Sequence, residues 1–192
     1  MYRCPVCSST DIEIIVDRKN VLVHQNLQFN SEKAAKDAKT GNLKMQLCHD
    51  CGFVFNSEFN PKLISYCEEY DNRQTCSPAF HSYIADLAHK VATHGKKAET
   101  KVVEVGCGNG EFINLILSLN NFSNKWIGYG FDPSYQGPLE SLDGRLQFVQ
   151  SYYDQEASSI DADLVCCRHV IEHVPDPVSM VASVRKIGRA HV

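Results

Sequence analysis

From residue 101 onward, the chain alternates short, β-branched apolar runs with stretches of helical spacing. Four runs have the length and composition of strands: Val102–Val105, Trp126–Phe131, Leu146–Gln150 and Asp163–Cys167. Residues 111–119 place apolar side chains at helical intervals, and a last helix is predicted to begin near Pro177. Strands that alternate with helices are typical of a parallel sheet flanked by helices, so we predict an α/β domain here.

The first 60 residues have a weaker, mixed pattern. Strand-like runs occur at Ile12–Val16, Val21–His24 and Phe53–Phe55, and the polar segment Ser31–Lys39 predicts a short helix. A clearer helix follows Ser77, a plausible N-cap, with Pro78 at its first position and Gly95 after its last turn. We therefore expect a small lobe over residues 1–76, a connecting helix within 77–100 and the α/β domain over 101–186.

Composition and charge narrow the class of protein. The chain has 192 residues and a net charge of −4, from 19 Lys and Arg against 23 Asp and Glu. This balance disfavours a generic nucleic-acid or membrane-surface binder, because both usually carry excess positive charge. No apolar run approaches the roughly 18 residues of a bilayer-spanning helix, and the N-terminus lacks the apolar region of a signal peptide. We expect a cytoplasmic protein with neither a nucleic-acid nor a membrane partner.

Four of the nine cysteines form two close pairs, Cys4 with Cys7 and Cys48 with Cys51. At CxxC spacing two thiolates can bind one tetrahedral metal ion, and two such pairs complete a four-thiolate zinc site without an open catalytic position. We predict a structural zinc ion in a zinc-ribbon-like lobe. The alternatives are four reduced, buried cysteines or a redox pair. Because residues 1–60 carry seven basic and seven acidic side chains, a scaffold is favoured over an RNA-binding lobe.

The segment VVEVGCGNGEF places a glycine-rich loop between a strand and a helix. Its glycines, Gly106, Gly108 and Gly110, allow a sharp turn and a close approach of the backbone to a ligand, and Glu104 lies two residues before the first of them. Asp132 ends the next strand, where a carboxylate can accept both ribose hydroxyls of an adenosine. The GxGxG spacing differs from the GxGxxG of dinucleotide-binding domains, although another nucleotide-binding α/β domain, such as a dehydrogenase, remains the alternative.

Three motifs in this order, EVGCGNG, FDPS and CRHVIEHVPDP, resemble those of class I S-adenosylmethionine-dependent methyltransferases over about residues 100–186. The resemblance implies a Rossmann-like methyltransferase sheet and S-adenosylmethionine as cofactor. It also implies that the glycine loop and Glu104 hold the methionyl and ribose portion and that Asp132 holds the ribose. In the same family the loop after the third strand, here with Ser151 and Tyr152, borders the adenine.

The first hundred residues are similar to the zinc-lobe methyltransferases, through the paired CxxC motifs, CGFVFN, the YDN run at Tyr70 and SPAF. Several members of that group methylate carbon atoms of deoxysugar nucleotides. The resemblance implies His173 as a base with Glu172 beside it, and Tyr70 as a substrate-holding residue. Val170 stands where some of those enzymes have a tyrosine. Because similar EHVPDP runs occur in methyltransferases that act on oxygen, the alternative is that the pair only shapes the crevice.

The end of the sequence suggests a truncated gene product. A complete fold of the resembling family has seven strands, whereas only four are predicted here, in the order 3-2-1-4, with the fourth as an apolar edge. The last six residues, 187–192, match one reading frame of a common sequencing-library adapter, so we expect an artefact there and an inactive fragment of an active parent enzyme. The leading function is methylation of a small molecule. The alternatives are an RNA methyltransferase and a non-catalytic cofactor-binding module.

Overall fold

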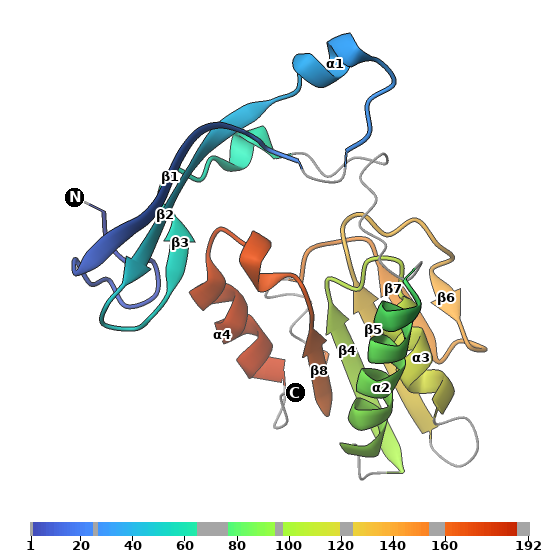
Figure 1. Cartoon of the computed structure of the whole chain (residues 1–192). Helices are drawn as coiled ribbons and strands as arrows, with labels where there is room; N and C mark the ends of the chain where they lie inside the picture. Colours follow the sequence, from blue (N-terminus) through green and yellow to red (C-terminus); the bar gives the residue numbers. More distant parts are fainter. Residues whose placement is uncertain are drawn as a thin grey trace. The chain divides into compact units, whose positions relative to one another are not determined.

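The computed structural model describes residues 2–24, 27–64, 77–94, 98–119, 125–153 and 160–187, with side chains as far as residue 185. Its contacts divide the chain into two units, residues 1–72 and 73–192, each with its own sheet (Figure 1). Among the predicted positions, Tyr70 and most of the 187–192 segment lie outside the described residues.

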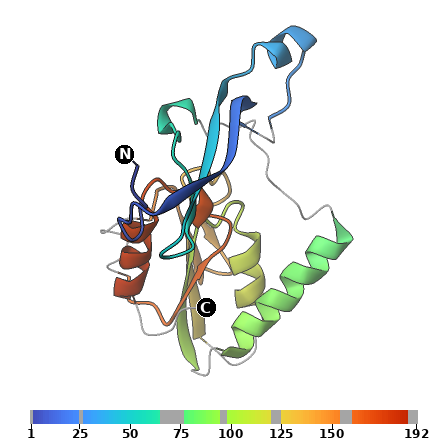
Figure 2. The same ribbon diagram turned by 60° about the vertical axis from the view of Figure 1, so that its left-hand side comes forward.

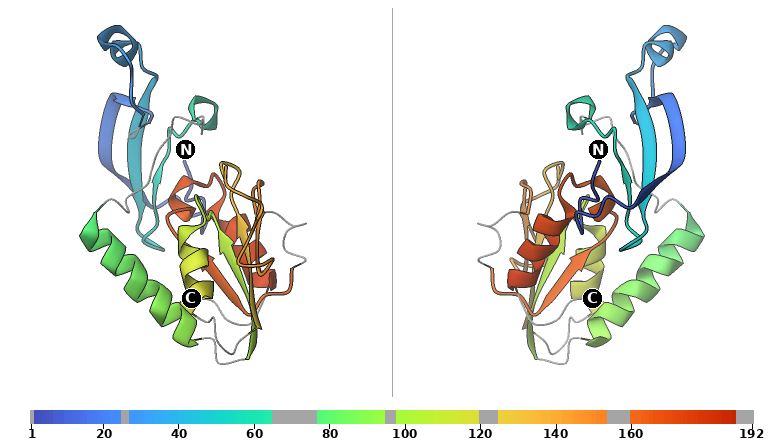
Figure 3. Two further views of the ribbon diagram at one scale, coloured as in Figure 1. Left: turned by 90° about the vertical axis from the view of Figure 1, so that its right-hand side faces the viewer. Right: turned by 90° about the vertical axis from the view of Figure 1, so that its left-hand side faces the viewer.

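The first unit is built on an antiparallel sheet in the order β1-β2-β3, with β1 at Ile12–Leu22, β2 at Thr40–Cys48 and β3 at Val54–Asn56. A short helix, α1 (Glu32–Lys36), lies at the far end of the β1–β2 hairpin (Figure 3), and a 3₁₀ turn, η1 (Pro61–Leu63), follows β3. The two runs predicted at residues 12–16 and 21–24 belong mostly to one strand, since the pairing with β2 continues through Asp17 and Arg18, with two irregularities in its register.

The second unit contains a mixed five-stranded sheet in the order β6-β7-β5-β4-β8. Its strands are β4 (Glu99–Val105), β5 (Lys125–Phe131), β6 (Glu140–Ser141), β7 (Leu146–Val149) and β8 (Leu164–Cys167). All are parallel except the two-residue β6, which pairs antiparallel with β7. The order β7-β5-β4-β8 is the predicted 3-2-1-4, and the sheet fits a Rossmann-like methyltransferase fold.

Helices cover both faces of this sheet. The longest, α2 (Pro78–His94), and α3 (Glu111–Leu119) lie on one face, while α4 (Pro177–Ile187) lies on the other (Figure 2). Successive side chains of a strand point to opposite faces, so Val102 packs in the α2–α3 cluster and Val103 in the cluster that includes α4. Within the described ranges, no helix has both the length and the apolar character needed to cross a bilayer.

The carboxyl ends of β4, β5 and β8 meet at one edge of this sheet. The β4–β8 ladder ends with Val105 opposite Cys167, and the β4–β5 ladder ends with Val105 opposite Phe131. Ligands of open α/β sheets bind outside the carboxyl ends of the strands, where the strand order reverses. The loops that leave these three strands therefore border the edge at which a ligand is expected.

Candidate functional site

The four paired cysteines of the first unit come together in one cluster. Their sulfur atoms all lie within 4.8 Å of one another, with 3.6 Å between Cys4 and Cys51 and 3.5 Å between Cys7 and Cys48. A tetrahedral zinc ion with Zn–S bonds of about 2.3 Å places its sulfur ligands roughly 3.8 Å apart. The spacing of the cluster thus fits a four-thiolate zinc site, although the cluster alone leaves the identity of a metal open.

The two CxxC segments have the same backbone hydrogen bonds. In each, the carbonyl of the first cysteine accepts the N–H of the residue four positions later, Ser8 after Cys4 and Gly52 after Cys48, at 2.9 Å. Both of those residues have a left-handed φ, 63° and 75°. The N–H of each first cysteine also donates to the carbonyl five positions later at 2.9 Å. Two equivalent turns therefore aim two pairs of sulfur atoms at a common point.

The backbone also tunes the thiols. Burial alone would raise the pKa of Cys4. Hydrogen bonds from the backbone N–H groups of Cys7 and Val6, and from neighbouring thiols, outweigh this effect and lower the pKa from an ordinary 9.0 to about 7. At Cys7 the N–H of Ser9 lowers the pKa, but burial and the three other thiols raise it to about 12. Cys4 is thus ready to ionise, while the raised pKa values of Cys7 and Cys51 disfavour further negative charge. A cation bound among the four sulfur atoms would offset the repulsion between thiolates and so allow all four thiols to ionise, as zinc ligation requires.

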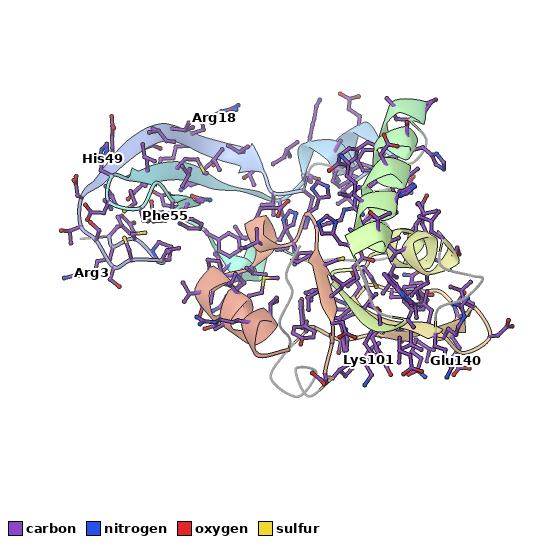
Figure 4. The ribbon with its side chains drawn as sticks, turned by 90° about the horizontal axis from the view of Figure 1, so that it is seen from below. Arg3, Arg18, His49, Phe55, Lys101 and Glu140 are labelled. Carbon is purple, nitrogen blue, oxygen red and sulfur yellow. The ribbon has the colours of Figure 1, made fainter. Side chains whose placement is uncertain are left out.

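Charged side chains flank this end of the lobe. Arg3 and His49, each one position from a paired cysteine in the sequence, lie at the same end of the β1–β3 sheet (Figure 4). Arg3 donates to the carbonyl of Ser8, in the first CxxC turn, at 3.1 Å. His49 lies 3.3 Å from a carboxylate oxygen of Glu13 on β1. These contacts fix the two turns against the chain around them.

In the second unit, the glycine loop of residues 106–110 connects β4 to α3. Gly106, Gly108 and Gly110 all have a left-handed φ, 70°, 56° and 76°. A Cβ at Gly106 would overlap the side chain of Val170, and one at Gly110 would overlap the ring of Phe148, while the space beside Gly108 is open. The first and third glycines thus allow close packing of the loop, and the second leaves its backbone accessible to a ligand.

Asp132 bonds directly to this loop. Its Oδ2 accepts the N–H of Gly108 at 2.8 Å, and its Oδ1 accepts both the N–H and the hydroxyl of Ser134, at 2.8 and 2.6 Å. A carboxylate has about four acceptor positions, so capacity remains for a ligand hydroxyl. Two of the residues predicted to hold the cofactor are therefore in direct contact, although 24 positions separate them in the sequence.

Glu104 lies beneath the loop rather than on its surface. It is 2% exposed, and its Oε2 accepts the N–H of Ile113, in the first turn of α3, at 3.2 Å. Burial raises its pKa to about 8, while the nearby Arg168 and the Ile113 N–H act in the opposite direction and Asp132 adds to the increase. In this position the carboxyl group links β4 to the start of α3 and so holds in place the two elements that the glycine loop connects.

The predicted adenine-side residues follow β7. Ser151 donates its hydroxyl to the carbonyl of Tyr152 at 3.2 Å, and the side chain of Tyr152 is 69% exposed. Tyr153 instead turns into the core, where its ring packs edge-on against Phe131 with centroids 5.2 Å apart. Tyr152 therefore stands in solvent at the carboxyl end of the sheet.

The predicted catalytic pair, Glu172 and His173, lies in a short 3₁₀ turn, η3 (Ile171–His173), and both side chains are exposed. The N–H of His173 donates to the carbonyl of Val170 at 2.8 Å, and Val170 is the residue packed against Gly106. Glu172 lies 3.8 Å from the Nδ1 of His169, a pairing not expected from the sequence. The turn therefore follows directly from a contact with the glycine loop.

Sequence reasoning missed Arg168, the residue immediately after β8. Its guanidinium carbon lies 4.0 Å above the centroid of the Phe112 ring in α3, and its charge acts on Glu104. A charged residue at the carboxyl end of a predicted parallel strand was the available signal. The motif that contains Arg168 was used instead to predict roles for Glu172 and His173.

Comparison with known proteins gives two findings. The sequence profile of a family described as "methyltransferase domain" matches residues 78–188. Among curated proteins, ubiquinone biosynthesis O-methyltransferase of Escherichia coli O157:H7 (strain EC4115 / EHEC) is 30% identical over 117 residues, which are 59% of this chain and 46% of that protein. The protein of the same name from Escherichia coli O127:H6 (strain E2348/69 / EPEC) is 29% identical over the same shares of both chains. The chain spans about half the length of the curated relatives it matches.

Proposed function

The chain belongs to the methyltransferase-domain family, and from that premise we propose that it binds S-adenosylmethionine and that the whole protein transfers the methyl group to a small molecule. The observation that carries the proposal is the hydrogen bond between Asp132 and Gly108 at the carboxyl edge of the sheet. In support of the proposal, this bond joins a carboxylate at the end of β5 to a glycine loop whose middle residue leaves the backbone open to a ligand.

The residues present suit this cofactor. Bound S-adenosylmethionine supplies an electrophilic methyl group on a sulfonium centre. Asp132 would hold the ribose hydroxyls, and the loop at Gly106–Gly110 would lie against the methionyl portion. Because methyl transfer is a displacement in line with the breaking bond, the protein contributes mainly alignment of the acceptor and, where needed, removal of a proton.

For the acceptor, we propose a carbon next to a carbonyl, as on a deoxysugar nucleotide, with His173 as the base. An imidazole titrates near neutral pH, which suits removal of such a proton. The η3 turn that carries His173 directly follows Val170, whose side chain packs against Gly106 of the glycine loop. Glu172 would assist His173, and Tyr70 would hold the substrate.

A second candidate is methyl transfer to oxygen, which is favoured by the curated relatives, both named as O-methyltransferases. A phenol or hydroxyl also loses a proton on methylation, so His173 fits either acceptor atom. The two are separated by supplying S-adenosylmethionine with a ¹³C-labelled methyl group together with candidate sugar nucleotides and phenols. The carbon chemical shift of the product then identifies the atom that received the methyl group.

The cofactor assignment is tested by calorimetry. Asp132→Asn should weaken S-adenosylmethionine binding by about 10-fold or more, because the amide keeps the contact with Gly108 but loses the charge-assisted bonds to hydroxyls. Asp161→Asn, at an exposed position of the same unit, is the matched control and should bind as the unchanged chain does. An unchanged chain that is folded and binds no cofactor would refute the proposal, and salt-dependent RNA binding would support the RNA methyltransferase instead.

For the cysteine cluster we propose a structural Zn²⁺ ion held by Cys4, Cys7, Cys48 and Cys51. The support is the sulfur spacing and the two equivalent backbone turns. The ion would join the N-terminal segment to the β2–β3 turn and leave no position open for substrate.

A further inference from the structure

We propose that Arg168 binds the α-carboxylate of the methionyl portion of S-adenosylmethionine and so selects a ligand with an intact amino-acid end. This inference rests on the proposed function. It assigns a positioning role to a residue outside the glycine loop, and the place, packing and charge environment of Arg168 each support it.

The place is fixed by the sheet. The last pair of the β4–β8 ladder immediately precedes Gly106 on one strand and Arg168 on the other, so both residues leave the sheet at its carboxyl edge. His169 then adopts a left-handed φ of 53°, and the next residue, Val170, packs its side chain where a Cβ of Gly106 would lie. Residues 168–170 therefore border the first glycine of the loop that is proposed to hold the methionyl portion.

The packing fixes the guanidinium while leaving its donors available. Its central carbon lies 4.0 Å from the centroid of the Phe112 ring, and that ring is only 4% exposed. Stacking uses the face of a guanidinium, whereas its N–H groups lie along the edge. Among the residues that the structure describes, none accepts a hydrogen bond from Arg168, and its side chain is only partly buried. The buried ring of Phe112 thus positions the guanidinium of Arg168 beside the glycine loop, with N–H groups available for a ligand.

The charges around it match the two ends of an amino acid. The carboxylate of Asp132 brings negative charge to the carboxyl end of β5, which favours the cationic sulfonium and ammonium groups of the cofactor. An α-carboxylate in the same place needs a positive partner, and Arg168 supplies one. Among the described side chains Glu104 forms no ion pair with Arg168 within 4 Å, and its Oε2 accepts the backbone N–H of Ile113. Arg168 can therefore accept a carboxylate through two parallel N–H···O bonds.

The test compares two ligands that differ in the carboxylate alone: S-adenosylmethionine and its decarboxylated form. Both are titrated calorimetrically into the unchanged chain, Arg168→Met and Arg168→Lys, with Arg185→Met, at an exposed position of α4, as the matched control. We expect Arg168→Met to weaken S-adenosylmethionine binding by about 10- to 100-fold and to leave binding of the decarboxylated ligand almost unchanged. Arg168→Lys should give a smaller loss, because an ammonium cannot form the bidentate contact, and Arg185→Met should change neither affinity.

The outcomes separate the possible explanations. Equal losses for both ligands would overturn the inference, because they would show that Arg168 acts only through its packing on Phe112. If Arg168→Met fails to fold, the ratio of the two affinities in Arg168→Lys decides: an unchanged ratio refutes carboxylate recognition, and a reduced preference for S-adenosylmethionine supports it. If the folded, unchanged chain binds neither ligand, the proposed function itself fails, and this inference with it.

Discussion

At Gly106 the space that a side chain would need is already filled by Val170, whereas at Gly108 it is empty. Both residues have a left-handed φ, which costs an L-residue about 1–2 kcal/mol. We therefore expect Gly108→Ala to lower the free energy of unfolding by about 1 kcal/mol and Gly106→Ala by about 3 kcal/mol, since the latter adds overpacking. Urea unfolding followed by fluorescence measures both, because the single tryptophan, Trp126, is fully buried in the same unit.

A double variant isolates the steric part of this effect. Val170→Ala removes the methyl groups that face Gly106, so Gly106→Ala combined with Val170→Ala should lose less than the sum of the two single variants. The backbone cost at position 106 would remain. Equal losses for the two glycine variants, or strict additivity in the double variant, would contradict the packing described here.

The buried carboxyl group of Glu104 predicts a dependence of stability on pH. Its pKa rises from an ordinary 4.5 to about 8 in the folded chain, chiefly through burial, so between these values the folded state holds a proton that the unfolded state has lost. The free energy of unfolding should therefore fall as the pH is raised through this window, by at most about 1.4 kcal/mol per pH unit from this group. In Glu104→Gln this contribution should vanish, because the amide does not ionise but can still accept the Ile113 N–H.

The measurement is the free energy of unfolding of the second unit, again from Trp126 fluorescence, at several pH values between 4.5 and 8 for both chains. The difference between the two chains cancels the titration of other groups. If the difference stays constant across the window, Glu104 ionises at its ordinary pKa and is hydrated in solution.

At the scale of elements, the sequence predicted those strands and helices whose apolar residues follow a regular spacing. The four parallel strands followed from apolar runs and helical spacing, and the glycine loop followed from its position between a strand and a helix, whereas the strand order was implied by the family resemblance. The strand β2 was missed although Leu43, Met45 and Leu47 alternate with polar residues, a pattern typical of a strand. Arg168 was missed because its role depends on Phe112, which lies 56 positions earlier and meets it only in the folded sheet.

The CxxC turns carry a prediction at the same scale. If the four sulfur atoms hold one zinc ion, Cys48→Ser should reduce the zinc content of the purified chain from about one ion per molecule to near zero, because a structural site needs all four ligands. Cys167→Ser, in the second unit, is the matched control and should keep its zinc. Elemental analysis by mass spectrometry measures both. Equal zinc contents in the two variants, or none in the unchanged chain, would exclude the assigned site.

At the scale of the molecule, the two units have separate sheets, and the described core clusters lie in the second unit alone. The first unit exposes most of β1 and has few buried side chains, with Cys4 and Cys48 among them at 2% and 0% exposure. A small lobe of this kind depends on a metal or disulfide in place of a large apolar core. The second unit, with Trp126 at its centre, has no such need.

Removal of the metal should therefore unfold one unit and spare the other. A strong chelator added to the zinc-loaded chain should increase amide hydrogen exchange in β1 and β2 to nearly that of an unfolded peptide, because zinc binding contributes directly to folding. Exchange in β4 and β5, and the fluorescence of Trp126, should stay unchanged, since the chelator removes no contact from that core. Loss of protection in both units at one chelator concentration would mean that they fold cooperatively, and unchanged protection in β1 and β2 would mean that the lobe is stable without metal.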